Sequence, residues 1–236
     1  MKNFYIKKGY KINSVNITND KVNNKKYWDR NRALSSEVYQ FPVYQFLNKF
    51  IKKNKIKKLI DVGCGIGTKL TFINKQNPSL EIIGIDQEDP IKYCNKTYTF
   101  GKWFVDDFED STLSNDLKTE LIVCCDVIEH IEDPDLLIDY IKSLLKKDGF
   151  AVISTPERDR LRGINCYDSP NKYHIREWNY DEFELYLESN GLEIIDHFIQ
   201  YPIKIAVNRF FLSIIRKRLL KLKPLKYNQV VIVKIK

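Results

Sequence analysis

The stretch 59-LIDVGCGIGTKL-70 determines how the rest of the chain is interpreted. A short apolar run reaches Asp61, three glycines follow at alternate positions, and a helical pattern resumes after them. Glycine is favoured where the backbone must pass close to a ligand at φ values that a Cβ would forbid. We therefore expect a strand, a tight ligand-binding turn and a helix over these residues.

On both sides of this turn, short apolar runs alternate with amphipathic segments. Strands are expected at residues 57–62, 80–86, 102–107, 120–126, 150–155, 192–199 and 229–235. Helices are expected within 38–54 and near 68–75, 89–96, 134–147 and 180–189, the last one opened by Asn179 and closed by Gly191. Continuous apolar strands alternating with helices are typical of an open, mostly parallel α/β sheet with both faces covered.

The length of 236 residues, with 43% hydrophobic residues, suits one sizeable core. We expect residues 1–45 to be a basic extension or lid and residues 46–236 to be one domain, with insertions at about 155–178 and 200–227. The polar, Lys-rich start and the lack of any long apolar run favour a cytoplasmic protein. The five cysteines form no CxxC pair, so we expect reduced thiols.

Ligands of open α/β sheets bind beyond the carboxyl ends of the strands. Carboxylates stand at four such ends, namely Asp61, Asp86, the pair 106–107 and Asp126. The glycine spacing is neither GxGxxG nor that of a Walker loop. Asp86 ends the second strand, where a carboxylate can accept hydrogen bonds from both hydroxyls of a ribose. The pattern therefore favours an adenosine without a pyrophosphate.

At this point a family resemblance becomes specific. "DVGCGIG" (61–67), "GIDQEDP" (84–90), "FVDDFED" (104–110) and "CCDVIEHIEDPD" (124–135) resemble, in order and spacing, the motifs of class I S-adenosylmethionine-dependent methyltransferases. The similarity is greatest to the small-molecule group with a DVIEHxxDP motif and covers about residues 57–200. It implies a Rossmann-like sandwich with a mostly parallel seven-stranded sheet and an antiparallel last strand, and S-adenosylmethionine as the cofactor.

The resemblance also implies which residues hold the cofactor. The glycines would border its methionine part, Asp61 would lie near its amino group, Asp86 and Gln87 would hold the ribose, and the 106–108 segment would meet the adenine. The implied set is Asp61, Gly63, Gly65, Gly67, Asp86, Gln87, Asp106, Asp107 and Phe108. The doubled aspartate leaves the adenine contact open between Asp106 and Asp107.

The implied reaction is an in-line attack on an activated methyl group, so the protein supplies alignment and, for some nucleophiles, a base. We take His174 as the preferred base, with Asp126 and His130 as further catalytic candidates. Alternatively, His174 is a loop histidine bonded to backbone, and His130 orders the turn after its strand. We expect no metal, although Asp126, Glu129, His130 and His174 resemble the metal-binding DxxEH plus distal His of some related methyltransferases.

The segment after residue 155 supplies candidates for acceptor binding. These are Arg158, Arg160, Arg162, Tyr173 and Arg176. Arginine forks bind phosphate or carboxylate at two points, which favours an anionic acceptor, although these arginines could instead pair with Glu157 and Asp159. The pattern TPxRxRxRG...HxREW (155–163 and 174–178) also resembles methyltransferases of glycan and lipopolysaccharide assembly, which favours O-methylation of a sugar, nucleotide-sugar or anionic glycan acceptor.

The basic, apolar segment 204–226 has three interpretations. It could be a lid or packed helix, it could contact an anionic membrane, or it could bind nucleic acid, which we consider the weakest because no RNA-binding module accompanies it. Two other functions stay open: an RNA methyltransferase, with or without a metal, and a non-catalytic member of the fold that docks a membrane or a protein.

Overall fold

The computed structural model describes residues 3–13, 30–111, 113, 117–200 and 228–236. Its centre is a seven-stranded sheet in the order β3-β2-β1-β4-β5-β7-β6. The strands are β1 (Lys58–Val62), β2 (Glu81–Asp86), β3 (Lys102–Val105), β4 (Thr119–Cys125), β5 (Leu145–Pro156), β6 (Leu192–Gln200) and β7 (Asn228–Ile235). Six strands run in the same direction, and β7 runs opposite to them between β5 and β6. This confirms the expected mostly parallel sheet with an antiparallel last strand.

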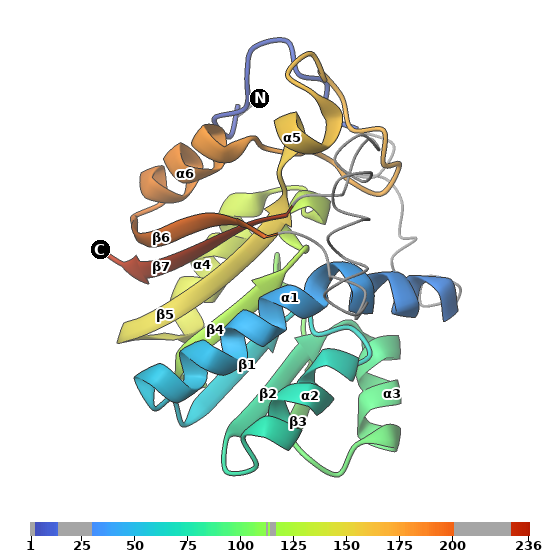
Figure 1. The fold of residues 1–236 in the computed structure, drawn as a ribbon, viewed down its shortest axis with the longest axis vertical. Coiled ribbons are helices and arrows are strands. Elements are labelled where there is room, and N and C mark those ends of the chain that lie inside the picture. The colour runs from blue at the N-terminus through green and yellow to red at the C-terminus, as the bar shows by residue number, and fades with distance from the viewer. Residues whose placement is uncertain (1–2, 14–29, 112, 114–116, 201–227) are drawn as a thin grey trace, which may run out of the picture.

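The helices cover both faces of this sheet (Figure 1). They are α1 (Arg30–Asn54), α2 (Thr68–Gln76), α3 (Glu88–Thr97), the 3-10 turn η3 (Ile128–His130), α4 (Pro134–Leu144), α5 (Arg158–Arg162) and α6 (Tyr180–Ser189). The first three pack on one face, where Leu59 and Leu121 point, and α4 and α6 pack on the other, where Ile60 and Ile122 point. The alternation along each strand therefore produces two separate hydrophobic layers.

Three element boundaries differ from those expected. Helix α1 runs from Arg30 to Asn54 and so begins before the expected start at residue 38. Helix α4 ends at Leu144 because the next residue is extended, buried and paired with Thr119. The segment after Thr155 contains the short helix α5, whose first N–H groups are capped by the carboxylate of Glu157.

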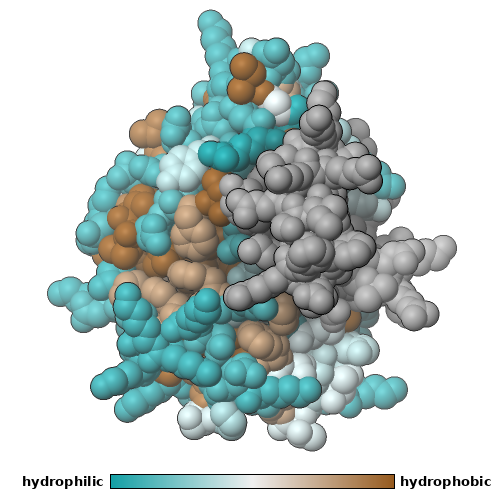
Figure 2. Space-filling view, in the orientation of Figure 1, coloured by the Kyte–Doolittle hydropathy of each residue, from teal (hydrophilic) through white to brown (hydrophobic). Residues whose placement is uncertain are grey.

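Aromatic side chains of α1 pack over the β5–β7–β6 end of the sheet. Phe46 lies 5.0 Å from Phe198 and Phe50 lies 5.1 Å from Phe150, measured between ring centroids. Figure 2 shows a group of apolar side chains over this part of the molecule, beside α1. Such edge and tilted ring contacts add to the burial that holds the helix on the sheet.

The expected basic segment 204–226 lies outside the described residues, as does residue range 14–29. Within the described part of the chain, no helix combines the length and the apolar character needed to cross a bilayer. All five cysteines are free, and four of them are buried.

Candidate functional site

The glycine turn has the backbone geometry that its sequence predicts. Gly63, Gly65 and Gly67 have φ values of 78°, 57° and 71°, in the left-handed region that favours glycine. A Cβ on Gly63 would stand 2.3 Å from Cγ2 of Val127, in the loop after β4. The turn after β1 therefore packs directly on the turn after β4, at the point of the sheet where connections diverge to either side.

Asp61 lies at the base of this turn and is fully buried. Its Oδ2 accepts a hydrogen bond of 2.7 Å from the hydroxyl of Tyr44 in α1. No group among the described residues donates to the buried Oδ1. Burial raises the pKa of Asp61 to about 7, although the hydrogen bond from Tyr44 and the nearby cation of Lys69 act in the opposite direction.

Asp86, at the end of β2, is bound to the glycine turn. Its Oδ2 accepts from the backbone N–H of Gly65 and its Oδ1 from that of Gln87, both at 2.7 Å. Burial raises the pKa of Asp86 while these two N–H groups lower it. Each carboxylate oxygen has a second lone pair, so the residue can hold the turn and still accept from a ligand hydroxyl.

The doubled aspartate after β3 divides into a buried and an exposed residue. Asp106 is 6% exposed, and its Oδ2 accepts from the hydroxyl of Ser111 at 2.6 Å. Asp107 is exposed and accepts from the backbone N–H of Glu109 at 2.9 Å. The ring of Phe108 packs on Tyr140 with centroids 5.4 Å apart. Of the two aspartates, Asp106 therefore faces the interior.

Asp126 follows β4 with a φ of 54°, a conformation that aspartate tolerates better than most residues. Its Oδ1 accepts from Ser154 Oγ at 2.8 Å and from Asn228 Nδ2 at 2.7 Å. The carboxylate therefore joins the ends of β4, β5 and β7. Among the described residues, it is not part of the group of side chains that could hold a metal ion, which Glu129, His130 and His174 form.

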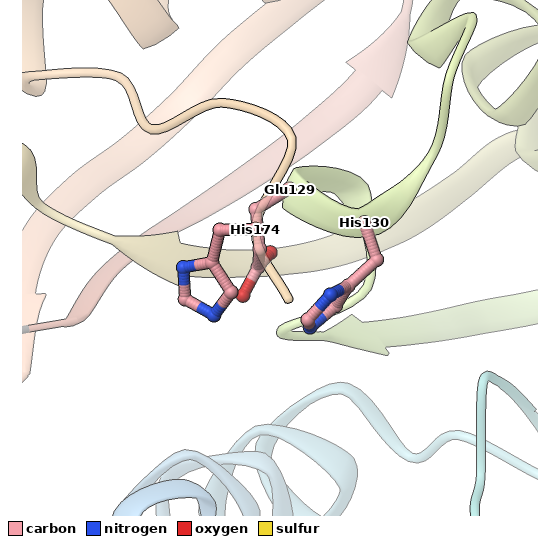
Figure 3. A group of neighbouring side chains, drawn as sticks. All are labelled: Glu129, His130 and His174. Carbon is pink, nitrogen blue, oxygen red and sulfur yellow. The ribbon is translucent and has the colours of Figure 1, made fainter. Parts of the chain in front are cut away.

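Glu129, His130 and His174 come together at the end of β4, and their ligand atoms all lie within 4.8 Å of one another (Figure 3). Glu129 is fully buried, its Oε2 accepts from Thr155 Oγ1 at 2.9 Å, and no described group donates to its Oε1. Burial, and then the charge of Asp126, raise the pKa of Glu129 well above its ordinary value. An unpartnered buried carboxyl oxygen next to two imidazoles fits a cation or a polar ligand.

The two histidines have their tautomers fixed by neighbours. His130 Nδ1 lies 2.6 Å from the carbonyl oxygen of Tyr173, and His174 Nδ1 lies 2.6 Å from Oε1 of Glu177. Because both partners accept, both Nδ1 atoms carry a proton, which leaves Nε2 as the acceptor atom of each ring in its neutral form. Nε2 of His174 accepts from the amide of Asn171 at 2.7 Å. Contacts with backbone and with a carboxylate thus orient both rings.

Glu177 is the residue of this site that sequence reasoning missed. It is fully buried and accepts from His174, from Arg162 and from Ser169. Burial alone would raise the pKa of Glu177, but the hydrogen bonds from His174 and Arg162 lower it to about 2. Its spacing of three residues from His174 was the available signal. Tyr44 and Lys69 were also missed. For Lys69 the available signal was a cation within an apolar helical pattern.

The expected acceptor-binding arginines are placed differently from one another. Arg158 is fully buried and donates to both carboxylate oxygens of Glu182, at 2.6 and 2.9 Å. Arg176 is 1% exposed and donates to the carbonyl oxygens of Ile131 and Glu132, each at 2.7 Å. These two guanidinium groups hold elements of the fold together.

The remaining acceptor candidates lie nearer the surface. Arg162 is partly exposed and donates to Glu177 at 3.0 and 3.1 Å. Arg160 and Tyr173 are exposed. Three of the four arginines therefore have carboxylate or carbonyl partners within the protein, and Arg158 and Arg162 both donate to Glu177.

Comparisons with known proteins bear on the family and the fold of the chain. A family model described as "Methyltransferase domain" matches residues 29–197. The chain is 32% identical over 111 residues to a ubiquinone biosynthesis O-methyltransferase of Actinobacillus pleuropneumoniae serotype 7, covering 43% of this chain and 47% of that protein. It is 24% identical over 174 residues to the tRNA U34 carboxymethyltransferase of Campylobacter lari, covering 64% of this chain and 59% of that protein.

A solved structure shows the same fold over nearly the whole chain. The plantazolicin methyltransferase BamL, in complex with a triazolic desmethylPZN analogue and SAH, has a TM-score of 0.63 and 16% identity, covering 95% of this chain and 94% of that one. The chain spans about half the length of the ubiquinone-biosynthesis relative that it matches. Because the family model covers well over half of the residues, the chain belongs to the methyltransferase-domain family.

Proposed function

We propose that the protein is an S-adenosylmethionine-dependent methyltransferase that methylates a hydroxyl group of its acceptor. The observation that carries this proposal is the left-handed glycine turn with the buried Oδ1 of Asp61 beneath it, an oxygen that no described residue satisfies. A buried carboxylate oxygen without a donor is costly, and the amino group of a bound amino acid is one partner that would satisfy it. Membership of the methyltransferase-domain family and the SAH-bound structural neighbours support the choice of cofactor.

The residues at the strand ends fit an adenosine joined to an amino acid. We propose that Asp61 and the three glycines hold the amino-acid end, that Asp86 and Gln87 hold the ribose, and that Asp106 and Phe108 meet the adenine. Asp107, being exposed, is the less favoured of the two aspartates. The cofactor, when bound, supplies a methyl group already activated by a sulfonium charge.

We propose that His174 removes the proton of the acceptor hydroxyl at Nε2, which carries a lone pair because Nδ1 donates to Glu177. The acceptor hydroxyl would replace the amide of Asn171 as the partner of Nε2. Glu177 stays ionised because its pKa is about 2, and so it stabilises the imidazolium that forms. His130 and Asp126 then position the loop: His130 bonds the carbonyl of Tyr173, and Asp126 joins the ends of three strands.

For the acceptor we propose a small or glycan-linked molecule that enters on the side of residues 158–176. The exposed Arg160 and Tyr173 are the side chains most accessible to it. The similarity to a ubiquinone biosynthesis O-methyltransferase supports transfer to oxygen. An anionic acceptor now depends chiefly on Arg160, since Arg158, Arg162 and Arg176 have partners within the protein.

Calorimetric titration with S-adenosylhomocysteine tests the proposal. The wild-type chain should bind, and Asp86→Ala should lose detectable binding because it removes both the ribose acceptor and the contact that holds Gly65. Glu88→Ala is the matched control, since that carboxylate is exposed on α3 and pairs with Lys92. A wild-type chain without affinity for S-adenosylhomocysteine would refute the assignment.

A second candidate is a metal-assisted transfer, which the cluster of Glu129, His130 and His174 favours. Two histidines and one carboxylate suit a divalent transition metal. Metal-ligating histidines usually donate their other ring N–H to a neighbouring acceptor, as both Nδ1 atoms do here. The Glu129 oxygen that has no donor could bind the ion as well. A bound cation would act as a Lewis acid on the acceptor oxygen, and the acceptor could then be an RNA hydroxyl.

Titration with Mn²⁺ separates the two candidates. If the cluster binds the ion, one site should appear whose affinity falls at least tenfold in Glu129→Gln, which keeps the shape but loses the charge. Activity should then disappear with a chelator and return with Mn²⁺. Chelator-resistant activity, or Mn²⁺ binding that is the same in Glu129→Gln, would leave His174 as the base.

A further inference from the structure

Tyr44 and Asp61 form a buried pair beneath the glycine turn. Both are fully buried, Tyr44 coming from α1 and Asp61 from β1. The hydroxyl donates to Oδ2 at 2.7 Å, while Oδ1 of the same carboxylate has no donor among the described residues. One oxygen of the carboxylate is thus held by Tyr44, and the other is held by no described residue.

The electrostatic surroundings of Asp61 are mixed. The titratable groups that face it are Tyr44 from α1, Lys69 from α2, Asp86 from β2, Cys64 from the turn, and Cys124 and Cys125 from β4. Lys69 is 5% exposed, and its ammonium lies 5.5 Å from the centre of the Tyr44 ring. Burial raises the pKa of Asp61 to about 7, against the hydrogen bond from Tyr44 and the charge of Lys69.

We propose that Tyr44 is a positioning residue for the amino-acid end of the cofactor. This inference rests on the cofactor assigned under the proposed function. Its hydroxyl fixes Oδ2 of Asp61, so that Oδ1 points to the α-ammonium group. Helix α1 thereby takes part in cofactor recognition although it precedes the glycine turn in the chain. The pair distinguishes a ligand with an α-ammonium from a nucleoside that lacks one.

Proton release follows from the same geometry. Above pH 7 Asp61 is ionised in the free protein and receives the ammonium directly. Below pH 7 it is protonated, and binding must expel that proton, so affinity for the ammonium ligand falls by up to about tenfold for each pH unit. The hydrogen bond from Tyr44 lowers the pKa of Asp61. Removing this hydroxyl therefore raises that pKa, and the decline in affinity begins at a higher pH.

The test is calorimetric titration of the full chain between pH 5.5 and 7.5 with two ligands. S-adenosylhomocysteine carries the α-ammonium, and 5′-methylthioadenosine keeps the adenosine and the thioether without it. Tyr44→Phe should bind S-adenosylhomocysteine about tenfold more weakly at pH 7, with the pH dependence displaced upward, because a hydrogen bond to a charged group is lost. Its binding of 5′-methylthioadenosine should stay within about twofold of wild type.

Two further variants complete the experiment. Asp61→Asn should bind S-adenosylhomocysteine weakly and without this pH dependence, because the amide does not ionise in this range. Tyr93→Phe, on an exposed tyrosine of α3, should match wild type for both ligands.

Equal weakening of both ligands by Tyr44→Phe, or an unshifted pH dependence, would overturn the inference and leave the proposed function intact. A wild-type chain that binds neither ligand would overturn both.

Discussion

Glu177 illustrates how a single buried carboxylate can be kept charged inside a protein. Burial alone would favour its neutral form, yet His174 and Arg162 both donate to it, and its pKa is about 2. The charge in turn fixes the Nδ1–H tautomer of His174. At the scale of one residue, the orientation of His174 therefore depends on a carboxylate that was not among the candidate site residues.

If His174 is the base and Glu177 orients it, substitutions of the two residues should lower kcat to different extents. Under the proposed function, His174→Gln should lower kcat by about a hundred- to ten-thousand-fold, the usual contribution of general-base catalysis, with S-adenosylhomocysteine binding retained. Glu177→Gln should lower kcat less, because the imidazole remains. His197→Gln on β6 is the control, since that histidine also bonds a carboxylate, Glu184. Unchanged kcat in His174→Gln would remove this histidine from the mechanism.

Helix α6 shows how local signals and a distant ion pair act on one element. Asn179, the residue expected to open this helix, accepts from the backbone N–H of Glu182, and Glu182 accepts from that of Asn179, so the two form a capping box. The same Glu182 carboxylate also accepts from the buried Arg158 and from the backbone of Lys7. The start of the helix therefore anchors α5 and the N-terminal segment.

Two substitutions at the start of this helix should lower the free energy of unfolding by different amounts. Asn179→Ala should lower the free energy of unfolding by about 1 kcal/mol, the usual value of an N-cap. Glu182→Ala should cost about 3–5 kcal/mol, because it leaves the buried guanidinium of Arg158 without its main partner. Glu188→Ala, exposed near the end of the helix, should stay within about 0.5 kcal/mol. Urea unfolding measures all three, and equal costs at positions 179 and 182 would contradict the role of the ion pair.

At the scale of the whole molecule, the N-terminal segment 3–13 closes over the part of the chain that follows β5. The indole N–H of Trp178 donates to the carbonyl oxygen of Phe4 at 2.8 Å, and the hydroxyl of Tyr10 accepts from the backbone of Glu177 at 3.1 Å. Trp178 is fully buried and stacks on Tyr186 of α6 with centroids 5.4 Å apart. Segments far apart in sequence thus meet around one side chain.

Trp178 should therefore be among the most sensitive positions of the core. Trp178→Ala should lower the free energy of unfolding by about 3–5 kcal/mol, the usual cost of truncating a buried aromatic residue. Trp178→Phe should cost less, since it keeps an aromatic ring and loses the hydrogen bond to Phe4. Circular dichroism during urea unfolding gives both values. A cost below 1 kcal/mol for Trp178→Ala would mean that the N-terminal segment contributes little.

Sequence patterns by themselves determined most of the helices and strands and the conformation of the glycine turn. The glycine turn, the strand-end carboxylates and the alternation of strands and helices depend on neighbours close in the chain, so they could be predicted with small errors at boundaries. Only the tertiary structure decided which charged groups pair. Arg158 meets Glu182 across 24 positions, and Glu129 meets His174 across 45. Such pairings follow from the packing of whole elements, which no local pattern encodes.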